Sequence, residues 1–449
     1  MIAVGQAASS DAEAKEASTN VRVSQDFYPA HVEPSVAVDP HNPLNLLAAS
    51  QLYGRRHDVL GTYVSFNGGA TWQDNGPLPA PRGANTGDDV TVVFDEHGTG
   101  YVAAMMTTAT AAGLSQSDRG LYVWRTLDGG RTFHAAVAVV LHTFVDHPWL
   151  AVGAGARGHA NVYAVWVTSN HKGLGFSRSL DSGRHFAAPR TISTPAAGVS
   201  VPVVAAGPHG TVYASFLASR GGTDAPGDAA DAASRRRGGP ARATGAETGN
   251  VSVDVVTSLD SGARFSVART VGSSRNRLQP ARTLSLPTGP SIAVDPQSGT
   301  VYVAYAAETG SSNTSDVLLA RSPDLGAIWD APTTVATGAS TGQVYFQPQV
   351  VVDDANGVDV SFYSLSRERV NLDLARSATR GQDFGSLTTV TSSPFQPNLG
   401  VHTAKTGAWW IGDYQGLAAG SGFAYPVWGD TRTGQLQIFA ASIPLTDLG

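Results

Sequence analysis

Seven similar runs of residues divide the chain into units. Each run begins at a polar or small residue, often with proline next, and continues as a short apolar segment, as in Glu33-Pro-Ser-Val-Ala-Val-Asp. The runs start at Glu33, Asp89, His147, Val201, Gly289, Gln347 and Asp413. A Gly or Asn turn and an aromatic-rich segment, such as GYVAAM or TVYVAY, follow most of them. The pattern predicts short buried strands connected by turns.

An octamer with the pattern Ser/Thr-x-Asp-x-Gly-x-x-aromatic forms a second repeat, out of phase with the first. Its six copies lie 53 to 79 residues apart and start at Ser65, Thr126, Ser179, Ser258, Ser322 and Ser377. The fifth position is Gly in all six copies, and the third is Asp in four. A short Asp accepts hydrogen bonds from the N–H groups of a turn, and Gly adopts a positive φ without strain. The octamer therefore predicts a tight turn between the third and fourth strands of each unit.

Seven units of about four strands predict an all-β chain: a seven-bladed β-propeller with four-stranded antiparallel blades. The seventh unit is short, and we expect the N-terminal segment 20–27 to supply its missing strand and close the ring. Residues 1–20 are expected to be a disordered tail, and residues 21–449 a single propeller domain. Residues 220–249, rich in Gly, Ala, Asp and Arg, are expected to form a flexible insertion in the fourth blade.

Composition narrows the functional classes. The 449 residues include no Cys, which excludes disulfides, thiolate metal sites and Cys nucleophiles. A formal net charge of -6 gives no indication of nucleic-acid binding, and no apolar run is long enough to span a membrane. The sequence also lacks nucleotide-binding, zinc-protease and nucleophile-elbow motifs. We expect a monomer with no nucleic-acid partner, no membrane span and no organic cofactor.

The octamer resembles the Asp-box, or BNR repeat, of the sialidase-like β-propeller superfamily, and this resemblance covers the first six units. It implies that the octamer turns are structural and lie on the face opposite the usual active site. Sialidases carry a Phe/Tyr-Arg-Ile-Pro motif on the first inner strand, and its Arg binds the substrate carboxylate. The matching stretch here is His31-Val32-Glu33-Pro34. Val32 cannot replace a guanidinium that pairs with a carboxylate, so ordinary sialidase activity is not expected.

Acidic residues gather where the seven inner strands begin, at one mouth of the central channel. The run-starting positions provide Glu33, Asp89, His147, Gln347 and Asp413, and neighbouring positions add Asp88, Asp146 and Tyr414. Like charges at close range are costly unless a cation or a proton offsets them.

Three interpretations of this acidic mouth remain open. Four carboxylates could hold Ca²⁺ or another divalent cation: Asp88, Asp89, Asp146 and Asp413. Six residues could act in acid–base catalysis: Glu33, Asp89, Asp146, His147, Asp413 and Tyr414. Alternatively, each carboxylate simply accepts hydrogen bonds from backbone N–H groups at the start of its own strand.

Aromatic and charged residues flank the same mouth and are candidates for substrate binding: Trp149, Trp410, Arg369, Asp430 and Arg432. Sugar rings stack on aromatic faces, although Trp in a propeller also serves as core. Arg55, Arg369 and Arg432 could form an anion clamp, or Asp430 and Arg432 could form a local ion pair.

The combined expectation is a secreted, extracellular propeller, its signal peptide absent or trimmed, that binds or cleaves glycans at an acidic channel mouth. If it is an enzyme, it is a sialidase-like glycoside hydrolase or a polysaccharide lyase. The alternative is a non-catalytic propeller that binds a glycan or a protein and contains a structural cation.

Overall fold

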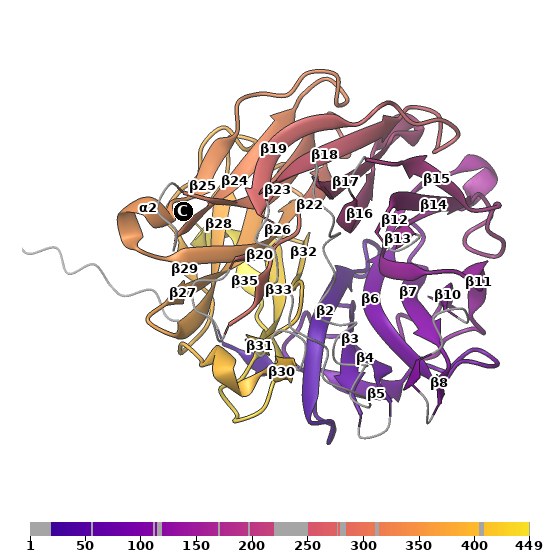
Figure 1. Ribbon diagram of the computed structural model, residues 1–449, viewed down its shortest axis with the longest axis horizontal. Helices are drawn as coiled ribbons and strands as arrows, with labels where there is room; N and C mark the ends of the chain where they lie inside the picture. Colours follow the sequence, from indigo (N-terminus) through magenta and orange to yellow (C-terminus); the bar gives the residue numbers. More distant parts are fainter. Residues whose placement is uncertain are drawn as a thin grey trace, which may run out of the picture.

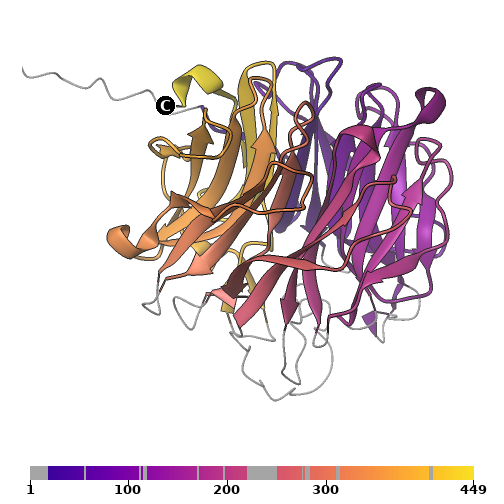
Figure 2. The same ribbon diagram turned by 90° about the horizontal axis from the view of Figure 1, so that it is seen from above.

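The computed structural model describes residues 19–54, 57–110, 113–114, 119–168, 171–195, 198–219, 250–275, 277–278, 284–309, 314–403 and 408–448. Figure 1 shows β-sheets arranged around a central axis, and Figure 2 shows the strands running roughly along that axis. The predicted N-terminal tail and the insertion at 220–249 lie outside the described residues, apart from residues 19 and 20. No helix among the described residues is long and apolar enough to cross a membrane.

Four of the sheets are separate four-stranded antiparallel blades, whose strands are named in order from the channel outward. The first contains β2 (Ala30–Val38), β3 (Leu46–Tyr53), β4 (Val59–Ser65) and β5 (Gln73–Pro77). The second contains β6 (Thr86–Phe94), β7 (Gly100–Thr107), β10 (Gly120–Thr126) and β11 (Val137–Leu141). The third contains β12 (Val145–Ala154), β13 (Ala160–Thr168), β14 (Gly173–Ser179) and β15 (Arg190–Ser193). The fourth contains β16 (Val199–Ala206), β17 (Val212–Ser219), β18 (Asn250–Ser258) and β19 (Arg269–Arg275).

A fifth separate blade closes the ring between the two ends of the chain. It contains β32 (Gly416–Gly420), β33 (Phe423–Asp430), β34 (Gln437–Ala440) and β1 (Val21–Arg22), with β35 (Ile443–Pro444) also pairing with β33. Val21 pairs with Ala440 and Arg22 with Phe439. The prediction that the N-terminal segment completes the last unit is confirmed.

The sixth large sheet is continuous over eight strands. It contains β22 (Ser291–Val294), β23 (Val301–Glu308), β24 (Ser315–Ser322), β25 (Thr333–Ala336), β26 (Val344–Val352), β27 (Val358–Ser366), β28 (Arg369–Ser377) and β29 (Thr388–Thr389). Strands β24 and β26 join in parallel through the pair Ser315 and Val344. The Ser315 hydroxyl also accepts the N–H of Tyr345 at 2.8 Å and donates to its carbonyl at 2.6 Å.

The predicted all-β propeller is confirmed, but the predicted seven separate four-stranded blades are wrong. In the part of the chain that the structure describes, five sheets of four or five strands stand as separate blades, and the remaining large sheet has eight strands. The two ladders are joined by a single parallel backbone pair, Ser315 with Val344, and the Ser315 hydroxyl bonds Tyr345 beside it. Each separate blade places one strand along the channel, and the eight-stranded sheet places two, β22 and β26.

Short elements complete the description. Two-stranded ribbons are formed by β8 (Ala109–Thr110) with β9 (Gly113–Leu114), β20 (Arg277–Leu278) with β21 (Leu286–Pro287), and β30 (Val401–Thr403) with β31 (Ala408–Trp410). One short helix, α2, spans Gly338–Thr341. Apolar clusters fill the spaces between neighbouring sheets, for example where Leu47 and Leu60 meet Val92 and Trp124.

The octamer turns have the predicted hydrogen bonds. In the copy after β14, the Ser179 hydroxyl donates to Asp181 at 2.7 Å and accepts the Gly183 N–H at 2.9 Å, while Asp181 accepts the His185 N–H at 2.9 Å. The fifth-position Gly has a positive φ in every copy, from 70° at Gly183 to 98° at Gly130. The prediction that these residues build turns is confirmed. The turns lie at the end of the channel opposite the start of the inner strands.

Candidate functional site

A repeated backbone irregularity sets the geometry of the acidic residues. On five inner strands the pairing register skips at the run-starting position, and that residue has a left-handed φ between 44° and 56°. These residues are Glu33, Asp89, His147, Val201 and Gln347. Proline follows all but Asp89, and a bulge suits proline because the bulged residue donates no ladder hydrogen bond.

This conformation carries a cost. A left-handed backbone at a residue other than Gly costs roughly 1–3 kcal/mol, and for the β-branched Val201 it is a genuine outlier. Bulges re-aim side chains, and strained backbones persist where the surrounding structure determines them fully. The five bulges therefore interrupt the regular hydrogen-bonded ladders at this end of the channel.

His147 lies between two carboxylates. Its Nε2 is 3.2 Å from Oδ2 of Asp413, and its Nδ1 is 3.9 Å from Oδ1 of Asp89. Its backbone N–H also donates to Oδ2 of Asp89 at 3.2 Å. All three residues are at most 2% exposed. The imidazole is therefore enclosed together with two carboxylates in a buried site.

Glu33 completes this acidic cluster, which we define as Glu33, Asp89, His147 and Asp413. Its side chain is fully buried, and neither carboxylate oxygen has a hydrogen-bond partner in the described part of the chain. Burial, and then the charges of Asp89 and Asp413, raise the pKa of Glu33 well above its ordinary value, while His147 partly opposes the shift. Glu33 is therefore biased toward its protonated, neutral form.

Aromatic residues hold the cluster from the side of β31 and β32. The Trp410 indole N–H donates to Oδ1 of Asp413 at 2.6 Å, and the Tyr414 hydroxyl donates to the carbonyl of Val90 at 3.0 Å. Burial and the nearby carboxylates raise the pKa of Tyr414 well above its ordinary value. Tyr414 therefore stays a neutral phenol, and its O–H is already hydrogen-bonded to the Val90 carbonyl.

Two predicted carboxylates belong to separate pairs. Asp88 accepts a hydrogen bond from the side-chain amide of Gln51. Oδ2 of Asp146 lies 3.5 Å from Nε2 of His171. The sequence analysis did not include Gln51 in the site, because no motif links a position on the second strand of one unit to the first strand of the next.

The predicted substrate-binding residues are dispersed. Arg432 donates from Nε and Nη2 to Oδ2 of Asp430 at 2.9 and 2.6 Å, and its Nη1 bonds Asn20 and Ser392. This is the local pair that the sequence allowed as an alternative, and it also anchors the N-terminal segment. Arg369 is exposed and donates only a long bond of 3.5 Å to the Pro394 carbonyl.

The two candidate tryptophans differ in position, and the candidate Arg55 lies outside the described residues. Trp410 is fully buried beside Asp413. Trp149 is half-buried on the channel wall, with its ring edge-on to Tyr414 at 5.3 Å between centroids.

The acidic cluster is covered. Trp410 is fully buried over Asp413, Tyr53 packs edge-on against Trp410, and the β30–β31 ribbon carries both Trp409 and Trp410. Leu284, just before β21, bridges to Trp409 and adds to this cover. The sequence left open whether the mouth is open, and the structure shows the cluster closed to solvent.

The donor set was tested as a cation site. Within the residues that the structure describes, no group of three or more His, Asp or Glu side chains has the spacing of a metal site. The clustered oxygens are of the type that Ca²⁺ prefers, but His147 already fills the space between Asp89 and Asp413. The predicted divalent cation remains a prediction.

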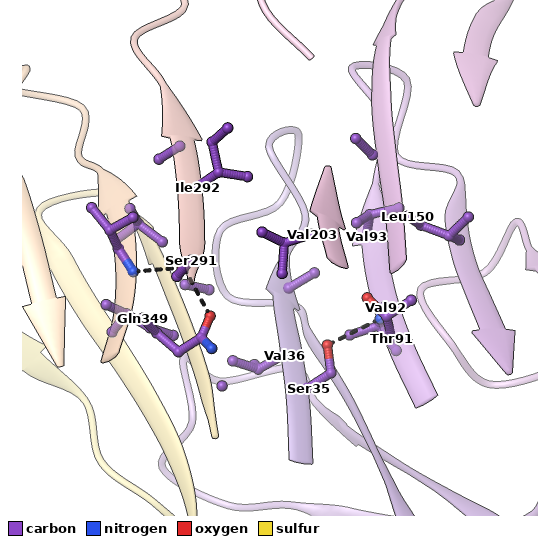
Figure 3. A pocket seen from close by; sticks show the side chains of 18 of the residues that line it. Ser35, Val36, Thr91, Val92, Val93, Leu150, Val203, Ser291, Ile292 and Gln349 are labelled. Atoms are coloured by element: carbon purple, nitrogen blue, oxygen red, sulfur yellow. Dashed lines mark hydrogen bonds between the residues drawn. The ribbon is translucent and has the colours of Figure 1, made fainter. Parts of the chain in front are cut away.

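An open cavity lies beside the cluster, along the channel axis. It has a volume of about 360 Å³ and is lined by all seven inner strands. Figure 3 shows the lining residues Ser35, Thr91, Val203, Ser291 and Gln349 together with Ile292. The lining begins two residues after each run-starting position, so cluster and cavity follow one another along the channel.

Comparisons with known proteins establish the fold alone. No family model and no curated protein matches the chain. A solved structure described as an ulvan lyase of polysaccharide lyase family PL25 is 13% identical, with a TM-score of 0.52, and the match covers 93% of this chain and 95% of that one. The same lyase bound to -[GlcA(1-4)Rha3S]- gives a TM-score of 0.51. The NanB sialidase of Streptococcus pneumoniae is 11% identical with a TM-score of 0.48, and the match covers 76% of this chain and 66% of the sialidase.

Proposed function

We propose that the protein acts on a glycan at the end of the propeller that contains the acidic cluster, and cleaves it by acid–base chemistry. The observation that carries the proposal is the position of His147 between Asp89 and Asp413, beside a buried Glu33 without hydrogen-bond partners. Buried like charges and strained backbones lower stability, and groups with strongly perturbed ionisation cluster at functional sites.

Each group has a role in this proposal. His147 exchanges a proton with the glycan, while Asp413 and Asp89 orient the ring and stabilise its positive form. Glu33, biased toward its neutral form, is the proton donor of the cluster. Contact with the glycan requires the β30–β31 ribbon to move away from Asp413, and this movement is part of the proposal.

The likeness in fold to the ulvan lyase supports a polymeric, acidic glycan as the substrate class, because that match spans nearly the full length of both chains. The departure at Val32 favours cleavage without the usual sialidase carboxylate clamp. A secreted, extracellular location belongs to the same proposal, since polymeric glycans are met outside the cell.

The test is a screen of the purified chain on ulvan, glycosaminoglycans and sialylated glycans. Hydrolysis produces new reducing ends only, whereas elimination also produces a double bond that absorbs ultraviolet light. The variant His147→Gln should abolish either signal. The matched control is His185→Gln, which removes an exposed His that lies 2.7 Å from Asp181 on the opposite face. Equal activity of His147→Gln and wild type would exclude the proposal.

A second candidate is a non-catalytic glycan- or protein-binding propeller with a structural cation. The specific observation in its favour is the pair of Glu33 oxygens without partners. In that case EDTA should lower the melting temperature and Ca²⁺ should restore it, with no glycan cleaved by the wild-type chain.

A further inference from the structure

The cavity in the central channel opens at the end opposite the acidic cluster. Five of its seven lining residues nearest the cluster, among them Ser35 and Gln415, are at most 6% exposed, whereas Val38 and Val352 at the far ends of the inner strands are half-buried. The inner strands run from the cluster toward the face that carries the octamer turns. Solvent therefore reaches the cavity from the octamer face, and the cluster lies below its floor.

Hydroxyl and amide groups line this floor. The Ser291 hydroxyl accepts the N–H of Val350 at 3.0 Å and donates to Oε1 of Gln349 at 3.1 Å. Figure 3 shows the bond that fixes the Gln349 oxygen, and the NH₂ group of the same side chain has no hydrogen-bond partner among the described residues. The Ser35 hydroxyl accepts a hydrogen bond from the N–H of Val92 at 3.1 Å, which leaves its own O–H able to donate to a ligand.

Gln415 lies at the same level but does not offer an accessible acceptor. Its Nε2 donates to the carbonyl of Gln347 at 3.3 Å and to the hydroxyl of Ser361 at 2.7 Å. Its Oε1 has no partner in the described chain, although the residue is 1% exposed. Neither solvent nor a ligand in the cavity reaches this oxygen, so the polar groups that the floor offers to a ligand are those of Gln349 and Ser35.

Charge and shape restrict the ligand. The described residues that line the cavity include no charged side chain, and above the floor the walls are Val, Ala, Leu, Ile, Phe and Gly. The carboxylates of Asp89 and Asp413 beneath the floor disfavour an anion. The half-buried Trp149 adds an aromatic surface that suits the C–H face of a sugar.

We propose that the channel floor binds a small neutral polyhydroxylated molecule, a polyol or a single sugar ring, that enters from the octamer face. Such a molecule accepts hydrogen bonds from the Gln349 amide and the Ser35 hydroxyl. The volume lies near the lower end of the roughly 300–1,000 Å³ of small-molecule pockets, so the floor takes one ring and not a chain. The proposal does not depend on the glycan-cleaving activity.

The test uses D-glucose and myo-inositol as neutral probes and D-glucuronate as the anionic probe. Calorimetric titration of the full chain should show binding of a neutral probe and much weaker binding of glucuronate. A crystal soaked in the bound probe should show it at Gln349 and Ser35. Gln349→Leu, which keeps the volume and removes the amide, should weaken binding several-fold to about tenfold.

The control is Gln73→Leu, at an exposed Gln on the outer strand β5, which should bind as wild type does. Thermal unfolding shows whether each variant is folded. If Gln349→Leu does not fold, the crystal of the wild-type chain soaked in the probe tests the proposal on its own. Water alone in the channel, a probe elsewhere, equal binding of glucuronate, or unchanged binding by a folded Gln349→Leu would each overturn the proposal. If His147→Gln loses glycan cleavage but still binds the probe, the acidic cluster and the channel floor are separate sites.

Discussion

The imidazole Nε2 of His147 lies 3.2 Å from Oδ2 of Asp413, and the two residues come from strand starts 266 positions apart in the chain. Asp413 is held in turn by the Trp410 indole. Replacing His147 by Gln removes the only imidazole of the acidic cluster, and with it the group that exchanges a proton in the proposed reaction. We expect glycan cleavage to fall by roughly 10²–10⁴-fold, the usual contribution of a positioned acid or base. Initial rates on the responsive glycan measure this, with His185→Gln as control.

Glu33→Gln should change stability with a defined pH dependence. The folded pKa of Glu33 is raised, so the folded chain binds a proton that the unfolded chain has lost. Stability is therefore fully present below the unfolded pKa and falls as pH rises above it. The neutral amide of the variant does not titrate, so the variant should gain stability relative to wild type between acidic and neutral pH. Urea unfolding across this range measures the difference, and parallel curves for the two proteins would contradict the burial of a titrating Glu33.

Asp359 allows the same experiment on a different sheet. It lies at the start of β27, buried near Asp353, with Arg376 at 3.5 Å, and burial raises its pKa to about 7. Wild-type stability should fall between pH 4 and pH 7 as the unfolded Asp359 ionises and the folded one does not. At about 1.4 kcal/mol per pKa unit, the Asp359→Asn variant should avoid a loss on the order of 4 kcal/mol. Urea unfolding of both proteins at each pH measures it; Asp353→Asn, which removes a partner of Arg376, should instead destabilise.

Gly262 provides a test of the octamer turns. Its φ is 75°, and a Cβ there would lie 2.5 Å from the Phe176 ring of the neighbouring blade. Gly76 has nearly the same φ, 74°, with open space around it. Gly262→Ala should therefore destabilise by about 1–3 kcal/mol more than Gly76→Ala, because only the first adds a steric clash. Denaturant melts of the two variants decide it, and neither should alter glycan cleavage.

The N-terminal strand can be tested by truncation. Residues before Gln25 provide the β1 pairs with β34, the bond of the Ser24 hydroxyl to Gln437 at 2.7 Å, and the bond of Asn20 to Arg432. Their removal exposes the edge of β34, so the melting temperature should drop by several degrees and aggregation should increase. Removal of residues 1–18 alone serves as the control, and an equal drop in both truncated chains would argue against the closure by β1.

The sequence predicted the strands, turns and run-starting positions because these depend on local patterns. The register that places Glu33, Asp89 and His147 at equivalent positions came from the alignment of seven runs, and the shared bulge at Glu33, Asp89, His147, Val201 and Gln347 agrees with it. Proline after four of these residues is the local signal of that bulge.

The remaining features depend on contacts between distant residues, which no local pattern encodes. One backbone pair, Ser315 with Val344, joins two ladders into one sheet. The cover over the cluster depends on where Trp410 packs. Gln51 reaches Asp88 across the boundary between two blades.

The pairing of β1 with β34 also has a consequence for synthesis. Val21 leaves the ribosome 419 residues ahead of its partner Ala440. At about 5–20 residues per second, this strand waits on the order of 20–80 s with its hydrogen-bonding edge unused. Throughout that time the growing ring is an open arc with two free edges. The chain therefore becomes a closed ring only after its last strands are made, and until then its oldest strand is the one most available to a chaperone or to another copy of the chain.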